Sequence, residues 1–385
     1  MRSVLAELAR LVIAAMQPTS KARSKFDLLC PLRHRKPASG GKGRSLARLN
    51  LVTGGSGFIG RHLVEALAAR GERVRVLDLR PLAPPREGVE LAIGSIIDAA
   101  HVARALEGCD RVFHLAANPN LWAPDPRTFD QVNHQGTRRM LEAAQKAGVE
   151  RFIYTSTESI LKSYRAPKTS QRALIDESVV LTLDDVPGPY CRSKFLAEEA
   201  AREAAAGGLP VVIVNPTMPI GPGDGLLTPP SKMILGFLNG ETPAYLDCAF
   251  NLVDARDVAE GQVLAAEKGR IGERYILGHV NLGLSDLLDE LQRLTGLAMP
   301  RTRVPYALAL VSALVSEGLA NITKKPPVAP LTGVRLARTS MAFDCSKAKN
   351  ELGWNCRTLE ASLTDTIRWM SGQGLLRRPV ALPLA

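Results

Sequence analysis

The feature that most restricts how this chain can fold is a glycine-rich turn between two patterned segments. Residues 49–53 read LNLVT, residues 54–60 read GGSGFIG, and a helical pattern runs from Arg61 to Arg70. A second apolar segment, Arg73–Asp78, then ends in a carboxylate. A strand, a glycine turn, a helix and a strand ending in an acid, within about 30 residues, predict a βαβ unit.

The glycines of this turn predict a dinucleotide site. Gly54 permits the tight turn, Gly57 lets the backbone approach a pyrophosphate, and Gly60 lets the helix pack on the sheet. Phe58 and Ile59, in the same turn, are further candidate cofactor contacts, and the N-terminus of the helix that follows offers unpaired N–H groups and a positive dipole end that favour phosphate.

Asp78 lies 18 residues after Gly60, at the end of the second strand. A carboxylate there accepts hydrogen bonds from the ribose hydroxyls and repels a 2′-phosphate. We therefore expect NAD, with NADP as the less favoured cofactor, although Arg80 stands close enough to soften the preference.

The spacing Gly54-x-x-Gly57-x-x-Gly60 resembles the extended short-chain dehydrogenase/reductases, the NAD-dependent epimerase/dehydratase family. Further segments share the resemblance, which covers about 49–373: Val112–Ala117, Asn133–Thr137, Tyr190–Lys194, Val211–Pro216, Asn251–Ala259 and Leu352–Trp354. The resemblance implies cofactor contacts from Ile96, Ala116 and Pro216, and a homodimer. Within the family, residues 121–126, 193–200, 211–216 and 269–278 look most like hopanoid-associated sugar epimerases, which have dihydroflavonol-reductase-like relatives.

Tyr190 and Lys194 are the candidate catalytic pair. They are four residues apart, so on a helix they share one face. Lys194 is expected to hold the nicotinamide ribose and to lower the pKa of Tyr190, which then acts as general acid or base. The family's third catalytic group, a hydroxyl, aligns with Thr157 rather than with Ser156. The dehydratases of the family carry an Asp-Glu pair next, but Glu158-Ser159 supplies one carboxylate, which disfavours dehydration.

Other polar residues have less specific interpretations. His114 lies on a buried strand and is expected to be a core histidine, and Asn133 is expected to pin two elements together or to orient a water. Arg256, Arg274, Arg301 and Arg303 are surface charges or, alternatively, hold the diphosphate of a nucleotide-linked substrate. No cluster of His, Cys and Asp suggests a metal site.

Alternating strand and helix patterns over 49–217 predict an α/β Rossmann domain, a doubly wound parallel sheet. Residues 218–373 add a smaller C-terminal substrate-binding lobe, partly interleaved with the first, and 374–385 form a tail. We expect the loops 160–189 and Pro219–Pro230 to set specificity for a small-molecule substrate. The apolar segment Val304–Leu319 is expected to be a buried helix, or else an apolar mouth for a lipid substrate.

The positive charge of the chain is concentrated at its start. The formal charge is +11, and residues 1–49 hold eleven Lys/Arg and two acids, so the other residues carry only +2. A nearly neutral body argues against nucleic acid. Residues 1–48 are expected to be a disordered basic extension, with a weak membrane-surface contact or a secretory signal as alternatives. Six scattered cysteines indicate reduced thiols and a cytoplasmic protein.

Three functions fit these patterns. The resemblance favours an NAD(P)-dependent sugar or nucleotide-sugar epimerase associated with hopanoid lipid metabolism. A ketone reductase or alcohol dehydrogenase for a hydrophobic substrate uses the same residues and stays open. A nucleotide-sensing protein without activity is the third, and the intact pair of Tyr190 and Lys194 counts against it.

Overall fold

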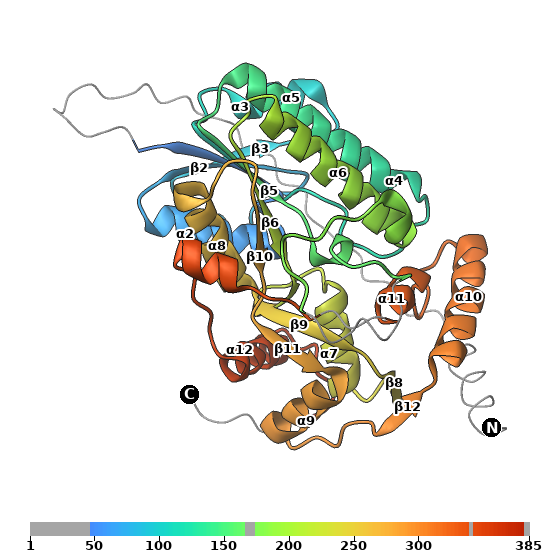
Figure 1. The fold of residues 1–385 in the computed structure, drawn as a ribbon. Coiled ribbons are helices and arrows are strands. Elements are labelled where there is room, and N and C mark those ends of the chain that lie inside the picture. Colours follow the sequence, from blue (N-terminus) through green and yellow to red (C-terminus); the bar gives the residue numbers. More distant parts are fainter. Residues whose placement is uncertain (1–46, 166–173, 339–341, 381–385) are drawn as a thin grey trace. The chain divides into compact units, whose positions relative to one another are not determined.

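The computed structural model describes residues 47–165, 174–338 and 342–380 (Figure 1). These residues belong to one compact unit, Leu46–Ala385. The expected basic extension lies outside the described residues as far as residue 46, and so do the last five residues of the expected tail. Residues 166–173, within the loop expected to set specificity, also lie outside them.

A parallel sheet of seven strands organises the first domain, with the order β10-β6-β5-β4-β1-β2-β3. The strands are β1 (Leu49–Thr53), β2 (Arg73–Asp78), β3 (Val89–Ile93), β4 (Arg111–His114), β5 (Arg151–Thr155), β6 (Val211–Pro216) and β10 (Arg274–Leu277). Every neighbouring pair is parallel. The order changes direction between β1 and β4, and such a switch point opens a crevice at the carboxyl ends of the strands. The predicted Rossmann fold is therefore confirmed.

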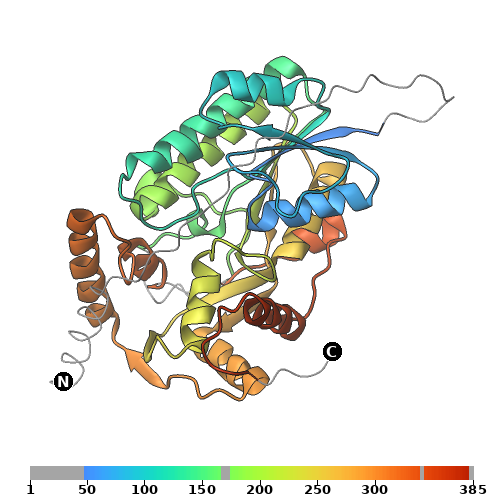
Figure 2. The ribbon, with the colours of Figure 1, turned by 180° about the vertical axis from the view of Figure 1, so that it is seen from behind.

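Helices cover both faces of this sheet (Figures 1 and 2). On one face lie α2 (Phe58–Ala69) and α8 (Ala255–Lys268), and on the other α3 (Ala99–Leu106), α5 (Thr137–Ala147) and α6 (Gly188–Ala206). The short helix α4 (Arg127–Phe129) and the π-helical turn η1 (Asp130–Gly136) lead into α5. The expected start of α2 at Arg61 was wrong by three residues, because Gly57 is the N-cap and the helix begins inside the glycine turn.

The smaller lobe contains a mixed three-stranded sheet with the order β11-β9-β7. Its strands are β7 (Met218–Ile220), β9 (Ala249–Asp254) and β11 (Val280–Gly283), and a parallel pair joins β8 (Ala244–Leu246) to β12 (Thr302–Val304). Three helices pack here: α7 (Pro229–Leu238), α9 (Leu284–Thr295) and α12 (Leu359–Gly372). Leucines at helical spacing bury one face of α9: Leu284, Leu287, Leu288, Leu291 and Leu294.

The chain passes between the two lobes more than once after residue 217. Helix α8 packs against α2, and β10 completes the large sheet beside β6. The closing element η5 (Ala348–Leu352) also packs on α8, where the buried Trp354 donates from Nε1 to Asp257 O at 2.7 Å. The lobes are therefore interleaved through α8 and β10.

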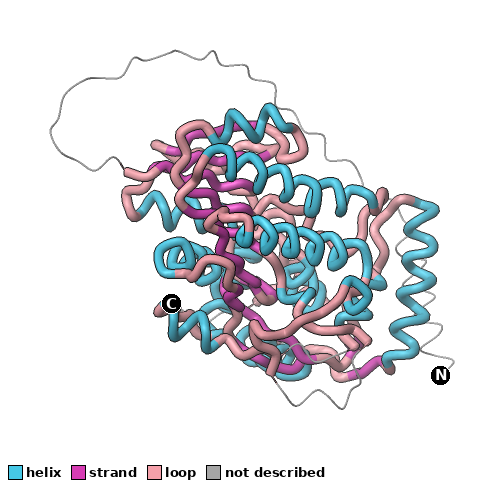
Figure 3. Tube along the Cα trace, turned by 45° about the horizontal axis from the view of Figure 1, so that its top comes forward, coloured by secondary structure: helices cyan, strands magenta, loops and turns pink. Residues whose placement is uncertain are grey.

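Helix α10 (Tyr306–Thr323) contradicts an expectation. The segment Val304–Leu319 was expected to be a buried helix, yet only 11% of α10 is buried. The helix lies at the rim of the smaller lobe, beside the short α11 (Leu331–Leu336), in all three backbone views (Figures 1, 2 and 3). By length and composition alone it is also long and apolar enough to cross a membrane. Its apolar pattern correctly indicated a helix, but an apolar pattern does not specify which surface covers it.

Candidate active site

The turn between β1 and α2 is so tight that side chains could not replace its glycines. Gly54 adopts a left-handed φ of 72°, and its N–H donates to Leu77 O at 2.9 Å. A Cβ on Gly54 would lie 2.8 Å from the backbone nitrogen of Ala116. A Cβ on Gly60 would lie 2.8 Å from Gly55 Cα and collide with Gly54 O. The turn therefore presents bare backbone at the carboxyl edge of the sheet.

The start of α2 is suited to an anion. Its N-cap is Gly57, which offers no side-chain cap, and its first turn carries no acidic residue. The N–H groups of Phe58 and Ile59 thus lie at a helix N-terminus that no side chain caps, where the dipole favours negative charge. The pyrophosphate of a dinucleotide fits this cradle, which a Cβ would fill.

Asp78 is held over the same turn by backbone hydrogen bonds. One carboxylate oxygen accepts from Ser56 N at 3.1 Å, and the other accepts from Arg80 N at 3.2 Å. The carboxylate stays partly exposed at the end of β2. This position, next to the phosphate cradle, suits recognition of ribose hydroxyls.

The other expected cofactor contacts also lie along the carboxyl edge of the large sheet. Ala116 follows β4, and its N–H donates to Thr53 Oγ1 at 3.1 Å. Ile96 follows β3 and is buried with its side chain against Gly136, and Pro216 is the last residue of β6. Because Ile96 turns its side chain into the core, only its backbone is suited to meet a cofactor.

Lys194 is buried and anchored to the end of β5. Its Nζ donates to Thr155 O at 2.7 Å and lies 4.6 Å from the ring centroid of Tyr154. Burial lowers the pKa of Lys194 to about 7, although the carboxylate of Glu198, one helical turn further along α6, opposes the shift. An ammonium held this way is preorganised to donate hydrogen bonds to a ribose.

Thr157 lies beside Tyr190, as a third catalytic group requires. It follows β5, and its hydroxyl lies close enough to the Tyr190 side chain to lower the pKa of that phenol. The same hydroxyl contacts Glu158 Oε2 at 2.9 Å and accepts from Ser159 N at 3.2 Å. Ser156, the alternative considered from the sequence, is buried and is not among the described residues that act on the Tyr190 hydroxyl. The geometry therefore joins Tyr190 to Thr157.

The expected lowering of the Tyr190 pKa was wrong. Burial raises the pKa of Tyr190, the negative charge of Glu158 raises it further, and the hydrogen bond with Thr157 offsets only part of the shift. Lys194, whose own pKa is near neutrality, is directed to the Thr155 carbonyl rather than to the phenol. Tyr190 is therefore a neutral phenol, a proton donor, at neutral pH.

Glu158 has a larger part in this site than the sequence suggested. Burial raises its pKa from 4.5 to about 7, against hydrogen bonds from Thr157 and Ser159 that lower it. The sequence had pointed to Glu158 only as half of a missing carboxylate pair. Its contact with Thr157 follows from the helical turn η2 (Glu158–Ile160), for which Thr157 is the N-cap.

A buried polar network supports the catalytic helix. Asn215 Nδ2 donates to Glu198 Oε2 at 2.8 Å and to Thr157 O at 3.2 Å. Arg274 Nη1 lies 3.4 Å from the other oxygen of Glu198. Glu198 was not predicted as a site residue from the sequence, although its position four residues after Lys194, on the same helix face, could have indicated the contact.

Asn133 and His114 have structural partners. Asn133 Nδ2 donates to Ser193 Oγ at 3.0 Å, and its Oδ1 accepts from Asn118 N at 2.7 Å, so it ties η1 to α6 and to the loop after β4. His114 is buried between the hydroxyls of Thr53 and Thr137, at 2.7 and 3.0 Å. Burial lowers the pKa of His114 to about 3, so it stays neutral at neutral pH.

The four arginines considered for a diphosphate all interact with carboxylates of the protein. Arg256 pairs with Asp254 and Asp365, at 2.7 and 2.8 Å. Arg274 pairs with Glu198, Arg301 with Asp289, and Arg303 with Asp247. The charge of each of these arginines is therefore already balanced by a carboxylate of the chain.

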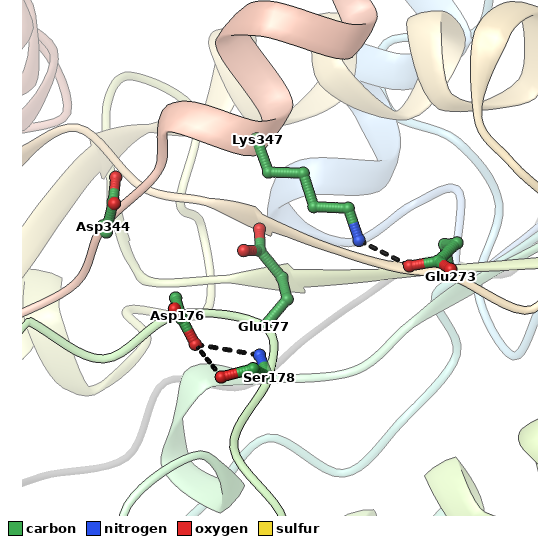
Figure 4. A pocket seen from close by; sticks show the side chains of 6 residues that line it. All are labelled: Asp176, Glu177, Ser178, Glu273, Asp344 and Lys347. Carbon is green, nitrogen blue, oxygen red and sulfur yellow. Dashed lines mark hydrogen bonds and ion pairs between the residues drawn. The ribbon is translucent and has the colours of Figure 1, made fainter.

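A hollow of about 380 Å³ lies away from these catalytic groups (Figure 4). Lys347 Nζ donates to Glu273 Oε2 across this hollow at 2.6 Å. Most of the side chains that line the hollow are acidic: Asp176, Glu177, Ser178, Glu273, Asp344 and Lys347. Among the described residues, no group of three or more His, Cys, Asp or Glu is arranged to hold a metal ion. We therefore place the candidate site at the carboxyl edge of the large sheet, not in this hollow.

The fold and this site define a nicotinamide-dependent oxidoreductase of the Rossmann class. Residues 50–283 match the sequence pattern of the "NAD dependent epimerase/dehydratase family". The chain belongs to that family, the extended short-chain dehydrogenase/reductases, which use NAD(P).

The alignments with similar proteins extend over most of this chain. It is 37% identical to "Putative dihydroflavonol 4-reductase" of Synechocystis sp., covering 86% of this chain and 97% of the relative. It is 32% identical to "Sterol demethylase protein B" of Methylococcus capsulatus, covering 85% and 99%.

Solved structures agree with the fold. The crystal structure of gox2253 is 37% identical with a TM-score of 0.73, covering 86% of this chain and 99% of the other. MoeE5, solved with UDP-glucuronic acid and NAD, is 26% identical with a TM-score of 0.66, covering 84% and 99%. The finer resemblance to hopanoid-associated sugar epimerases stays a prediction.

Proposed function

We propose that this chain is an NAD(H)-dependent dehydrogenase/reductase that interconverts a secondary alcohol and a ketone on an apolar substrate. The observation that carries the proposal is that Arg256, Arg274, Arg301 and Arg303 each pair with a carboxylate of the same chain. A diphosphate would have to compete with each of these ion pairs. The relatives named for dihydroflavonol and sterol chemistry support an apolar substrate.

The protonated phenol of Tyr190 suits the proton transfer that carbonyl reduction needs. A bound reduced nicotinamide supplies hydride to the carbonyl carbon, and the oxygen then needs a proton. The Tyr190 phenol is protonated at neutral pH, as an ordinary tyrosine is, and burial raises its pKa further, so it can donate that proton. Thr157, in contact with Tyr190, holds the reacting oxygen, and Lys194 holds the ribose.

Glu158 is placed to return a proton to Tyr190. Its pKa of about 7 leaves it partly protonated at neutral pH, and the hydroxyl of Thr157 lies between it and the phenol. A proton passing from Glu158 to Thr157, as Thr157 passes its own to the phenolate, restores the neutral Tyr190. This path runs along the hydrogen bond between Thr157 Oγ1 and Glu158 Oε2 and the contact of Thr157 with Tyr190.

We propose NAD(H) rather than NADP(H) as the preferred cofactor. Asp78 stands beside the phosphate cradle with a carboxylate that accepts hydrogen bonds from the turn itself. Its charge opposes a 2′-phosphate. Arg80 is exposed and uses its backbone N–H, not its guanidinium, to bond Asp78.

A sugar epimerase is the second candidate. The family's own description and the NAD-bound sugar-nucleotide complex of MoeE5 favour it. An epimerase returns the hydride to the carbon that lost it, so it retains its nucleotide through turnover, whereas a reductase exchanges it. The residues named so far serve either reaction.

Cofactor exchange separates the two candidates. Purified protein is passed through gel filtration, its retained nucleotide is measured, and NADH consumption is followed with apolar ketones and separately with UDP-sugars. We expect little retained nucleotide and NADH consumption with a polycyclic or isoprenoid ketone, abolished in Tyr190→Phe. Tightly retained NAD, with interconversion of UDP-sugars and no NADH consumption, would establish the epimerase instead.

A further inference from the structure

Helix α10 carries its large apolar side chains on the face that is turned away from the rest of the protein. Its inner face carries small and polar residues: Ala313 and Ala320 are buried, Ser316 accepts from Val328 N, and Glu317 accepts from Leu331 N. Its outer face carries large apolar residues that are 46–80% exposed: Val311, Leu314, Val315, Leu319 and Ile322. Their spacing of three and four residues aligns them in one continuous stripe.

This outer stripe carries no charge. Glu317 is the only charged residue between Tyr306 and Thr323, and it faces inward to the segment that leads to α11. The other exposed positions of α10 are Ala307, Gly318, Asn321 and Thr323, and none of them is charged. A contiguous exposed apolar face of this length indicates an interaction surface.

Positive charge follows directly at the end of the stripe. Lys324 and Lys325 are both exposed, and Lys324 Nζ donates to the backbone carbonyl of Pro124 at 3.4 Å. Asp125, close enough for Lys324 to lower its pKa, is already paired with Arg127 at 2.9 Å. Val328 beyond the lysines is 73% exposed. An apolar helix face bordered by lysines matches a bilayer with anionic headgroups.

We propose that the outer face of α10 docks on an anionic phospholipid membrane, lying in the plane of the headgroups. Both ends of the helix are held by the same folded body, which prevents it from crossing the bilayer. Before it, β12 pairs with β8. At its end, Trp122 Nε1 donates to Asn321 Oδ1 at 3.2 Å, a position where an indole suits the interface.

A second copy of the chain fits this face less well. An antiparallel contact between two α10 helices would place Lys324 and Lys325 of each copy near the positive N-terminal end of the other helix. A parallel contact would place the lysines against one another. Anionic lipid instead gains from the same charges.

The docked face adjoins the candidate active site. Helix α11 packs on α10 and places the buried Thr332 directly against Gly188, two residues before Tyr190. Leu121 Cδ1 lies 3.2 Å from the position of a Cβ on Gly333. Docking would therefore bring the start of α6 close to the membrane, independently of which substrate the site takes.

Vesicle binding of the full chain tests this proposal. Sedimentation is measured with phosphatidylcholine vesicles and with vesicles that also contain phosphatidylglycerol, and we expect tighter binding to the second. Leu314→Glu with Ile322→Glu should lower the partition coefficient about tenfold or more, because apolar contact is lost. Lys324→Gln with Lys325→Gln should lower binding to the anionic vesicles alone, by about tenfold.

A matched control keeps the test specific, because residues 1–48 also carry positive charge. Ile271→Glu with Val180→Glu adds the same two charges at positions 55% and 80% exposed, against 51% and 80% for Leu314 and Ile322. This control should bind vesicles as the wild type does, and retained NADH binding shows that each variant is folded. Equal binding by the stripe variant, or no binding by the wild type, would overturn the proposal.

A second readout does not depend on variants of the stripe. Brominated lipid should quench the tryptophan fluorescence of the wild type, and Trp122→Phe should reduce that quenching, since Trp354 is buried and Trp369 is a partly buried residue of α12. Undiminished quenching in Trp122→Phe would contradict a docked α10. If the stripe variant instead converts a dimer to a monomer in sedimentation velocity with vesicle binding unchanged, the face is a contact between copies.

Discussion

Replacing Glu158 with Gln should make the stability of this protein less sensitive to pH. Burial raises the pKa of Glu158 from 4.5 to about 7 in the folded protein. Between these two values the folded state binds more protons than the unfolded state at this residue, so stability falls as pH rises. Above pH 7 the loss is complete, because the carboxylate is then ionised in both states.

The magnitude follows from the two pKa values. They differ by about 2.5, and each pKa unit is worth about 1.4 kcal/mol, so ionisation of Glu158 costs the folded state about 3 kcal/mol at pH 8 and under about 1 kcal/mol at pH 5. The glutamine of the Glu158→Gln variant is neutral at both pH values. Its carbonyl can still accept from Thr157, and its amide can donate to Ser159 Oγ.

Urea unfolding at pH 5 and pH 8 measures this difference. We expect Glu158→Gln to exceed the wild type in free energy of unfolding by about 2–3 kcal/mol more at pH 8 than at pH 5. The low pKa of His114 gives an opposite slope below pH 6.5, but it cancels in the difference between the variants. Glu87→Gln, at an exposed position, is the control. An equal difference at both pH values would refute the raised pKa of a buried Glu158.

Three further changes test the site. Tyr190→Phe should lower kcat by about 10²–10⁴-fold with NADH affinity unchanged, and fluorescence titration checks the affinity; unchanged turnover would remove Tyr190 from the mechanism. Asp78→Ala should lower the preference for NADH over NADPH about tenfold or more in kcat/KM, and an unaltered ratio would contradict the ribose contact. Gly60→Ala should lower the free energy of unfolding by about 1–3 kcal/mol and weaken nucleotide binding, because the added Cβ would collide with Gly54 O. Calorimetry measures the stability and titration measures the binding. A variant that is as stable as the wild type and binds nucleotide as tightly would argue against this packing.

The parts of this structure that local pattern determines were predictable. The glycine turn and its flanking strands depend on residues close in sequence, so Gly54, Gly60 and Asp78 could be placed from spacing alone. The four-residue spacing of Tyr190 and Lys194 likewise put both on one helix face. The start of α2 was misplaced because the sequence does not show where a glycine turn ends and its helix begins.

What could not be predicted depends on partners distant in sequence. The charge state of Tyr190 depends on Glu158, more than 30 residues earlier, and on the degree of burial. Arg256 is balanced by Asp365, more than 100 residues later. Helix α10 has a pattern that fits a core helix equally well, and only the packing of α11 and the 328–331 segment reveals which face is covered.

Two features bear on the substrate, the paired arginines and the exposed face of α10, and they point to the same chemistry. A diphosphate needs cations whose charge is available, yet the candidate arginines are paired with aspartate or glutamate. An apolar substrate dissolved in a membrane has to pass from the lipid to the active site. The exposed face of α10, which we propose docks on a membrane, lies next to α11, and α11 contacts the start of the catalytic helix at Gly188. Since these features involve different residues and different forces, their agreement supports an apolar substrate more strongly than either does alone.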